Sequence, residues 1–397
     1  MQLITRLNKY FKSFFYSSCI NDHPTVLMGH QGQDLIDFFK IDKDNYICSS
    51  NKRPINFNIL LQGIIFFVKT ALFNPKVFRK TLRWFHTIYF ICAYLKLKKI
   101  KCLISFTDYN PLPMYIRQIL DTEIKTIGIQ NSRRENRSDY SNFDFYLLLL
   151  PLRKSEKKIL KNCIMQEFGS LRLLLSISKK NKWKEIIEFP SNNINLNELT
   201  LISSLTADFL RFIKMNFEPN NSLIKFKKKL NDLKEQFQNK ENQFRELRFL
   251  NFLILCDFIS DYAQKKNDKV TILNRSETKT VNFVEEERFY KIFPNFELKH
   301  LTKVEKYDYI LTKKDRIFAS DISTLSRECL SINTKCIFFN NHIEYTGKYW
   351  TNNDSIFYSN KESKEDFHSR LEKIQQLNDK GFSHEKKKIK DESIIIS

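Results

Sequence analysis

Short apolar runs alternate with longer stretches of helical periodicity along most of the 397-residue chain. The runs are rich in β-branched and aromatic residues, as is typical of strands that are buried on both faces. Strand–helix alternation at this spacing predicts parallel sheets covered by helices, and so an α/β fold. The strands expected are 24–30, 45–50, 101–108, 124–131, 143–150, 198–205, 269–275, 307–312, 316–320 and 335–340.

Helical patterns fill the intervals between these strands. Residues 56–100 read as helical, with a break at Asn74–Pro75 because proline cannot continue a helix. The charged region from about 221 to 265 predicts one or two long helices, since apolar heptads do not persist in it. Further helices are expected at 34–42, 113–121 and 284–293, after Asp321, and at 361–382.

The chain is too long for one ordinary core, and the alternation is interrupted by Pro151 and a basic stretch after it. We therefore expect two domains, 1–165 and 166–360, followed by a closing helix and a frayed basic tail over 361–397. Ligands of open parallel sheets bind outside the carboxyl ends of the strands. Two such sheets facing each other predict a site in the cleft between them.

The formal net charge of +21 favours anionic partners, but a Lys- and Asn-rich composition of the kind that an AT-rich genome encodes explains it equally well. Eight cysteines without a CxxC pair predict free buried thiols in a reducing cytoplasm. No apolar run is long enough to span a membrane. Basic residues flank the two longest uncharged runs, which leaves peripheral contact with a membrane open.

Several kinds of chemistry have no matching motif in the sequence. The seven glycines form neither GxGxxG nor a Walker A loop, and HExxH, GxSxG and zinc-deaminase signatures are missing. Seven scattered histidines predict no metal cluster. The expected site therefore uses backbone amides, hydroxyls and carboxylates, without a metal or another cofactor.

The stretch "FASDISTLSRECLSINTKCIFFN" combines a strand with a helix that begins near Ser323 and Thr324. Free amides and the dipole at a helix N-terminus bind phosphate, and hydroxyls there add further donors. Glu328 follows one turn after Thr324, where its carboxylate could accept hydrogen bonds from a ribose or sugar hydroxyl. The alternative is that Asp321 or Ser323 is only an N-cap, worth about 1 kcal/mol.

This stretch resembles the "S-T-L-x-x-E-x-L…G-x-K-x-x-F-F" segment of a bacterial family of surface-carbohydrate biosynthesis transferases. Three other segments are similar to that family in the right order, so that the resemblance covers roughly residues 100–345. They are "ISFTDYNPLPMYIRQILDTEIKTIGIQNSRRE" (104–135), "QEFGSLR" (166–172) and "LTLISSL" (199–205).

The resemblance implies a GT-B glycosyltransferase with two facing Rossmann-like domains. It places a nucleotide-sugar donor on the C-terminal domain and the acceptor on the N-terminal one, and it implies a metal-independent transfer that builds a surface polysaccharide. The sequence departs from the family at Asn333, where a glycine is usual, and in the first loop, "MGHQGQD". Asn also accepts the left-handed conformation, whereas the loop puts the acceptor contacts near it in doubt.

Candidates for the general base follow two of the predicted strands. Asp108 ends a buried strand, where a carboxylate can take the proton of an acceptor hydroxyl, although it can equally cap the turn that follows. His30 is the alternative base, or otherwise a surface histidine.

Candidates for binding lie at other strand ends. Gly169 and Ser170 could place an amide near the donor diphosphate or simply form a linker turn, and Arg275 could meet a phosphate or a base. On the acceptor side, Gln130 and Asn131 suit sugar hydroxyls, and Arg133 suits a phosphate, with a solvated polar loop as the alternative.

Together with these residues, the resemblance implies a cytoplasmic glycosyltransferase that acts on a glycan or lipid-linked acceptor, with a membrane contact at its inner face left open. A glycerol- or ribitol-phosphate polymerase of similar architecture is the first alternative. A basic nucleic-acid-binding protein is the second, but the dispersed Lys and Arg and the aromatics at core positions do not favour it. We therefore expect no nucleic-acid partner.

Overall fold

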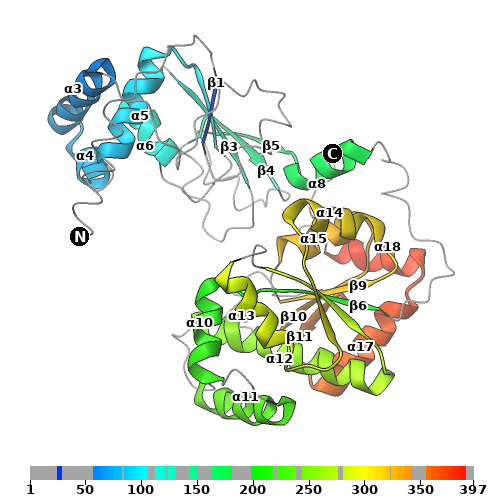
Figure 1. Ribbon diagram of the computed structural model, residues 1–397. Coiled ribbons are helices and arrows are strands. Elements are labelled where there is room, and N and C mark those ends of the chain that lie inside the picture. The colour runs from blue at the N-terminus through cyan, green and yellow to red at the C-terminus, as the bar shows by residue number, and fades with distance from the viewer. Residues whose placement is uncertain are drawn as a thin grey trace. The chain divides into compact units, whose positions relative to one another are not determined.

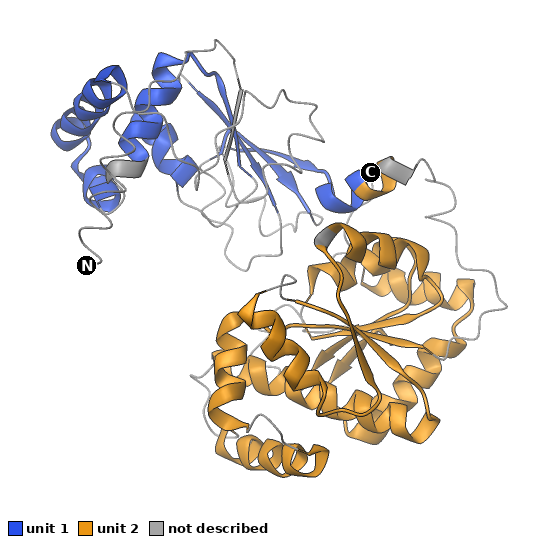
Figure 2. Cartoon of the chain, viewed as in Figure 1, with its two compact units in different colours: residues 1–175, 397 blue, residues 176–396 orange. Residues whose placement is uncertain are grey.

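The computed structural model describes most of the chain and divides it into two compact units, residues 1–175 and 176–396 (Figure 2). Each unit contains one parallel sheet with helices packed on it, which confirms the predicted α/β class (Figure 1). The residues described are 25–28, 57–82, 85–105, 112–120, 124–130, 143–149, 163–180, 198–217, 222–237, 244–275, 280–321, 323–341 and 355–389.

The sheet of unit 1 has five strands that follow one another in sequence order, and every neighbouring pair is parallel. Gly128 lies in the middle strand because the ring of Tyr146 crosses its backbone: a Cβ at this position would lie 2.5 Å from Cδ2 of Tyr146. The strands are β1 (Thr25–Met28), β2 (Cys102–Ser105), β3 (Lys125–Ile129), β4 (Phe145–Leu148) and β5 (Ile164–Glu167).

Helices cover both faces of this sheet. Leu103 of β2 packs with the helices before and after it, whereas the next residue, Ile104, packs with Leu171 of α8 on the other face. The predicted break at Asn74 is confirmed, since its side chain accepts a hydrogen bond of 3.3 Å from the Val77 amide and starts a new helix. The helices are α3 (Phe57–Phe73), α4 (Pro75–Thr81), α5 (Phe85–Leu97), α6 (Leu112–Leu120) and α8 (Leu171–Lys180).

The sheet of unit 2 has six parallel strands in the order β11-β10-β9-β6-β7-β8. This is the doubly wound order of Rossmann folds, in which the chain runs outward in one direction and then returns to the centre to run outward in the other. The direction changes between β6 and β9. The strands are β6 (Leu199–Ile202), β7 (Val270–Leu273), β8 (Phe296–Lys299), β9 (Ile317–Ser320), β10 (Cys336–Asn340) and β11 (Tyr358–Asn360).

The helices of unit 2 lie on both sides of its sheet (Figure 1). The predicted helical region 221–265 consists of two helices, α11 (Leu223–Phe237) and α12 (Phe244–Lys266), and the twelve consecutive residues 249–260 of α12 are buried. The remaining helices are α10 (Ala207–Asn216), α13 (Val281–Tyr290), α14 (Lys303–Thr312), α15 (Thr324–Ser331), α17 (Lys364–Gln376) and α18 (Asp379–Lys388).

One predicted strand is wrong. Residues 307–312 belong to α14, which begins with a capping box: the Thr302 side chain accepts from the Glu305 amide, and the Glu305 carboxylate accepts from the Thr302 amide. This reciprocal cap starts a helix whose later residues, read alone, alternate like a strand. The strand that precedes it, β8, was not predicted, because none of its residues is fully buried and apolar and charged residues alternate along it.

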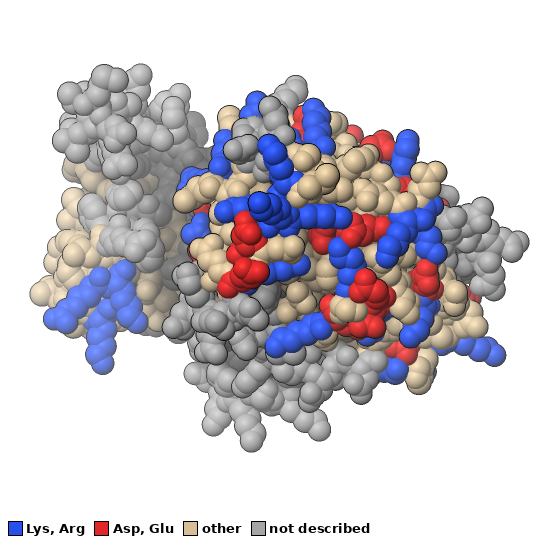
Figure 3. Space-filling view, turned by 90° about the horizontal axis from the view of Figure 1, so that it is seen from below, with Lys and Arg blue, Asp and Glu red and all other residues tan. Residues whose placement is uncertain are grey.

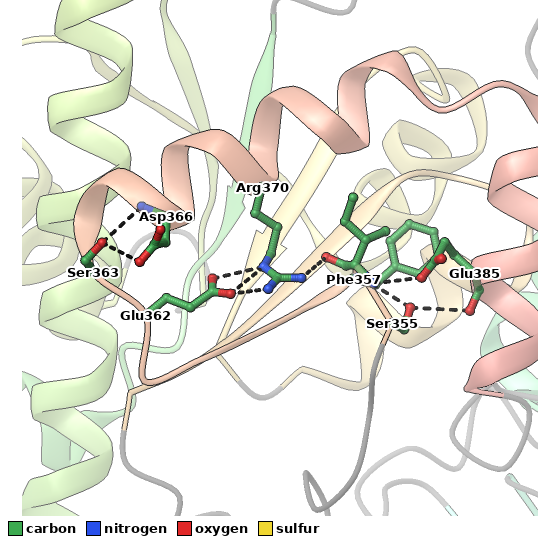
Figure 4. A network of polar contacts seen from close by, with 8 residues as sticks. Ser355, Phe357, Glu362, Ser363, Asp366, Arg370 and Glu385 are labelled. Carbon is green, nitrogen blue, oxygen red and sulfur yellow. Dashed lines mark hydrogen bonds and ion pairs between the residues drawn. The ribbon is translucent and has the colours of Figure 1, made fainter.

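The C-terminal residues are part of unit 2 and contain two helices where the sequence predicted one helix and a frayed tail. Figure 4 shows the polar contacts around β11 and these helices. Arg370 of α17 donates from Nε to both carboxylate oxygens of Glu362 (2.8 and 2.9 Å). Glu385 of α18 accepts from the Ile356 amide at 2.8 Å, so that α18 is fastened to the residues just before β11.

No helix in the described part of the chain is long and apolar enough to cross a membrane. The cysteines there are all free, namely Cys92, Cys102, Cys163, Cys256, Cys329 and Cys336.

Candidate functional site

The candidate site is the carboxyl edge of the unit 2 sheet where β6 and β9 lie side by side. The strand order reverses at this pair, and ligands of open α/β sheets bind outside the carboxyl ends of the strands at such a switch point. Polar residues follow both strands: Ser203 and Ser204 after β6, and Asp321 and Ser323 after β9.

Ser204 and Asp321 join the two strand ends. The Ser204 hydroxyl donates a hydrogen bond to Oδ1 of Asp321, and both side chains are buried. The second carboxylate oxygen, Oδ2, has no hydrogen-bond partner among the described residues, although Asp321 is 0% exposed. A buried carboxylate oxygen without a partner is costly, and such groups in a native structure point to a bound water, ion or ligand.

Helix α15 begins directly beyond Asp321, with Ser323 as its N-cap. Its first-turn amides have no acceptor inside the helix. Ser323 has extended backbone angles suitable for capping, but its side chain makes no cap hydrogen bond. Ser323 and Thr324 are partly exposed.

This uncapped start distinguishes α15 from the other described helices whose N-caps are defined. In α10, α13, α14, α17 and α18, the side chain of the cap accepts a hydrogen bond from a backbone amide of the first turn. Ser323 is extended like Ser363 of α17, but its φ of −136° and ψ of 130° differ from the −64° and 165° of Ser363, and its side chain makes no cap hydrogen bond. The amides of α15 are thus left for another acceptor.

Glu328 faces the interior of unit 2. It is 2% exposed, and the hydroxyl of Tyr307 from α14 donates to both of its carboxylate oxygens (3.1 and 2.9 Å). This bond gives the carboxylate a structural partner past the first turn of α15. The contact with a ribose or sugar hydroxyl stays a prediction, and it requires a ligand to reach a side chain that packing covers.

The far end of α15 is held by a lysine from the C-terminal helix. Lys386 of α18 donates to the Ser331 carbonyl (2.9 Å) and to Oδ1 of Asn333 (2.8 Å). Its positive charge complements the negative end of the helix dipole. Burial lowers the pKa of Lys386 to about 8. Asn333 adopts a left-handed φ of 62°, as expected for the residue that replaces the glycine of the resembling family.

Tyr290 of α13 and Cys256 of α12 lie near the switch point. Burial raises the pKa of each well above its ordinary value, and the neighbouring Asp321 carboxylate adds to both increases. The two groups therefore stay neutral at physiological pH, so that neither adds a charge next to Asp321.

The other donor-side candidates have structural roles in the chain. Gly169 has a φ of 93°, which glycine adopts easily, and the Ser170 hydroxyl accepts from the Leu173 amide at 3.3 Å as the cap of α8. The Arg275 side chain is exposed at the carboxyl end of β7, and its amide donates to Oε1 of buried Glu286 at 2.7 Å. The predicted contacts with a donor diphosphate or base are not tested by these bonds.

On the acceptor side, only Gln130 is described. It follows β3, is 2% exposed, and accepts from the Leu149 amide at 2.9 Å, which braces the neighbouring strand end. Its Nε2 has no partner within the described ranges. His30, Asp108, Asn131 and Arg133 lie outside the described residues.

The sequence did not single out Ser204, whose partner Asp321 is 117 positions away. The signal available was the pair of serines directly after the strand in "LISSL", at the end where ligands bind. The described residues bring together no group of three or more His, Cys, Asp or Glu that could hold a metal ion.

No protein-family model matches the sequence, and no curated protein matches it. Among solved structures, the UDP-GlcNAc 2-epimerase of Methanocaldococcus jannaschii is similar with a TM-score of 0.45 and 10% identity, over 89% of this chain and 93% of that one. The wall teichoic acid polymerase TagF gives 0.41 and 9%, over 91% and 83%. Glycyrrhiza uralensis UGT73P12 gives 0.45 and 8%, over 93% and 90%.

Proposed function

We propose that the chain is a metal-independent GT-B-type glycosyltransferase. It transfers a sugar from a nucleotide-sugar donor, bound by unit 2, to a glycan or lipid-linked acceptor during the synthesis of a bacterial surface polysaccharide. The reaction takes place in the cytoplasm, with unit 1 on the acceptor side.

The observation that carries this proposal is the uncapped N-terminus of α15 at the switch point of the unit 2 sheet. In a doubly wound sheet this is where a nucleotide's phosphates meet helix amides. Ser323 and Thr324 add hydroxyl donors, and Oδ2 of Asp321 is a buried acceptor without a partner among the described residues, which a hydroxyl of the ligand reaches when the residues that cover it move.

The chemistry follows from this arrangement. When the sugar leaves the donor, negative charge develops on the departing diphosphate. Fixed amides and a helix dipole stabilise that charge without reorganising, which is the way in which preorganised donors accelerate a reaction. At the opposite end of α15, Lys386 donates a hydrogen bond to the Ser331 carbonyl and so complements the dipole of the same helix.

The remaining predicted contacts belong to the same proposal. Arg275 and the Gly169–Ser170 segment approach the donor's phosphates or base, and Gln130, Asn131 and Arg133 contact the acceptor. Asp108, or His30 in its place, takes the proton of the acceptor hydroxyl. Glu328 meets the ribose only if Tyr307 gives up its hydrogen bonds, so we assign it the weakest role.

Thermal unfolding with nucleotide sugars tests the proposal. The wild-type protein is melted alone and with UDP-, GDP-, CMP- and dTDP-linked sugars at millimolar concentration. A ligand at 100 times its Kd stabilises the folded state by about 2.7 kcal/mol, which is a shift of several degrees. At least one donor should produce it; a folded protein that responds to none of them contradicts the proposal.

A further inference from the structure

Helix α3 of unit 1 exposes an unbroken apolar face. Seven large hydrophobic residues on it are each between 47% and 79% exposed. At 3.6 residues per turn most of them fall within about 100° of arc, the width of the apolar stripe of an amphipathic helix. We call this face the α3 stripe; its residues are Phe57, Leu61, Ile64, Ile65, Val68, Leu72 and Phe73.

The opposite face of α3 is already packed. Ile59 and Phe66 are buried in the core of the helical layer. Gly63 lets Phe90 of α5 approach so closely that a Cβ would lie 2.7 Å from its Cδ1. Phe67 makes edge-to-face contact with Tyr89 at 5.3 Å between ring centroids. The stripe therefore does not arise from a helix that has turned away from its own core.

The surroundings of the stripe are basic. From Asn51 to Thr107 the sequence contains no Asp or Glu. Lys69 borders the stripe on α3, and the exposed Lys76, Arg79 and Lys80 follow on α4. In Figure 3, the described Lys and Arg side chains over unit 1 stand without an acidic neighbour, whereas both signs mix over unit 2.

An apolar face beside positive charge, with no acidic residue in α3 or α4 themselves, matches the surface of a membrane that contains anionic lipid. Such a helix lies in the interfacial plane, with its apolar face among the acyl chains and its basic residues at the headgroups. α3 has 17 residues and is fixed to α5 on its other side, so it can lie on a bilayer but does not cross it.

We propose that the α3 stripe, with the basic residues of α4, docks unit 1 on an anionic membrane surface. The inference deepens the proposed function, since a lipid-linked acceptor resides in such a surface, but its test needs no sugar donor. Failure of one can therefore be distinguished from failure of the other.

Vesicle flotation tests the docking. The full chain is mixed with vesicles of phosphatidylcholine alone, or with 30% phosphatidylglycerol added, at low and high salt. The stripe variant carries Ile64→Gln, Val68→Gln and Leu72→Gln. Its matched control, Ile224→Gln, Val281→Gln and Val304→Gln, changes three apolar residues of unit 2 that are at least 61% exposed. A third variant reverses charge by Lys76→Glu, Arg79→Glu and Lys80→Glu.

The wild type and the matched control should float with the anionic vesicles and much less with phosphatidylcholine. The stripe variant should bind at least about tenfold more weakly at either salt concentration, because each glutamine removes apolar area from the interface. The charge variant should lose the preference for anionic lipid. Melting temperatures should stay close to that of the wild type, since all substituted residues are exposed.

Several outcomes overturn the inference. One is a wild type that does not float with anionic vesicles, or a stripe variant that floats as well as the control. Another is a wild-type dimer that the stripe variant converts to a monomer without any change in vesicle binding, which would assign the face to a second copy of the chain. Binding of a random oligonucleotide that competes fully with vesicles would likewise replace the membrane by nucleic acid.

Discussion

The two edges of the unit 2 sheet use buried polar groups in opposite ways. At the amino edge, Arg316 donates from Nη1 to Oγ1 of Thr271 (2.8 Å) and to the hydroxyl of Tyr309 (2.6 Å), and Nη2 pairs with Glu198. Only its Nε lacks a partner in the described structure. At the carboxyl edge, Asp321 has one bond from Ser204, and its other oxygen has none among the residues described.

We expect the polar groups at the amino edge to contribute mainly to stability and those at the carboxyl edge mainly to ligand binding. Arg316 has three partners within the chain, and removing a buried charged group with several such partners is costly. Asp321 and the start of α15 lack some partners within the described chain. This reduces stability slightly, and we expect these groups to bind a ligand. Substitutions at the amino edge should therefore change unfolding, and substitutions at the carboxyl edge should change binding.

The largest effect is expected at the amino edge. Arg316→Met removes the charged donor from the buried hydroxyls of Thr271 and Tyr309 and should lower the free energy of unfolding by about 3 kcal/mol in urea titrations. Donor binding by the folded fraction should not change. The control is Arg288→Met, whose exposed pair with Glu285 should contribute less than about 1 kcal/mol. Equal losses in the two variants would remove the contrast between the edges.

Asp321→Asn should do the reverse at the carboxyl edge. The variant keeps an oxygen for the Ser204 hydroxyl but removes a buried negative charge with an open lone pair. The free energy of unfolding should stay the same or rise by up to about 2 kcal/mol, while donor affinity falls at least about tenfold. Urea unfolding and isothermal titration with the donor found in the thermal screen measure the two quantities. A variant that unfolds more easily and binds normally would make Asp321 a structural residue.

The pH dependence of stability tests the cost of burying the Lys386 charge at the end of α15. Its pKa is about 8 in the folded protein, against an ordinary value of 10.5, because of burial. Between these values the unfolded chain binds more protons, so the free energy of unfolding should rise with pH, by up to about 1.4 kcal/mol per unit. Below pH 8 the cost of burying the charge is constant. Lys386→Met should lack this contribution, and identical slopes in both proteins would contradict it.

Much of the fold was predictable because its strands are buried on both faces. The runs at 198–205, 269–275 and 316–320 are apolar for that reason, and all three are central strands. Strand β8 was missed because none of its residues is fully buried, and its sequence therefore contains no continuous apolar run. Apolar and polar residues alternate over 307–312 as in a strand, but the capping box of Thr302 and Glu305 starts a helix that includes them.

The candidate site was predictable only in part. A hydroxyl pair at the start of a helix after a buried strand is a local pattern, and it led to Ser323 and Thr324. The bond between Ser204 and Asp321, and the support of α15 by Lys386, join residues far apart in sequence. They depend on which strands are neighbours in the sheet and on the return of the C-terminal helix, which no local pattern specifies.

Two serine N-caps offer the most direct test of the central claim, that α15 begins open for an anionic ligand. Ser363 caps α17 with its side chain, whereas Ser323 makes no such bond at α15. Melting of Ser323→Ala and Ser363→Ala with and without the nucleotide sugar compares them. Ser363→Ala should lose about 1 kcal/mol of stability and keep the full donor-induced shift, and Ser323→Ala should keep its stability and lose most of the shift. Equal donor-induced shifts in both variants, or a loss of stability in Ser323→Ala without a loss of binding, would contradict the claim.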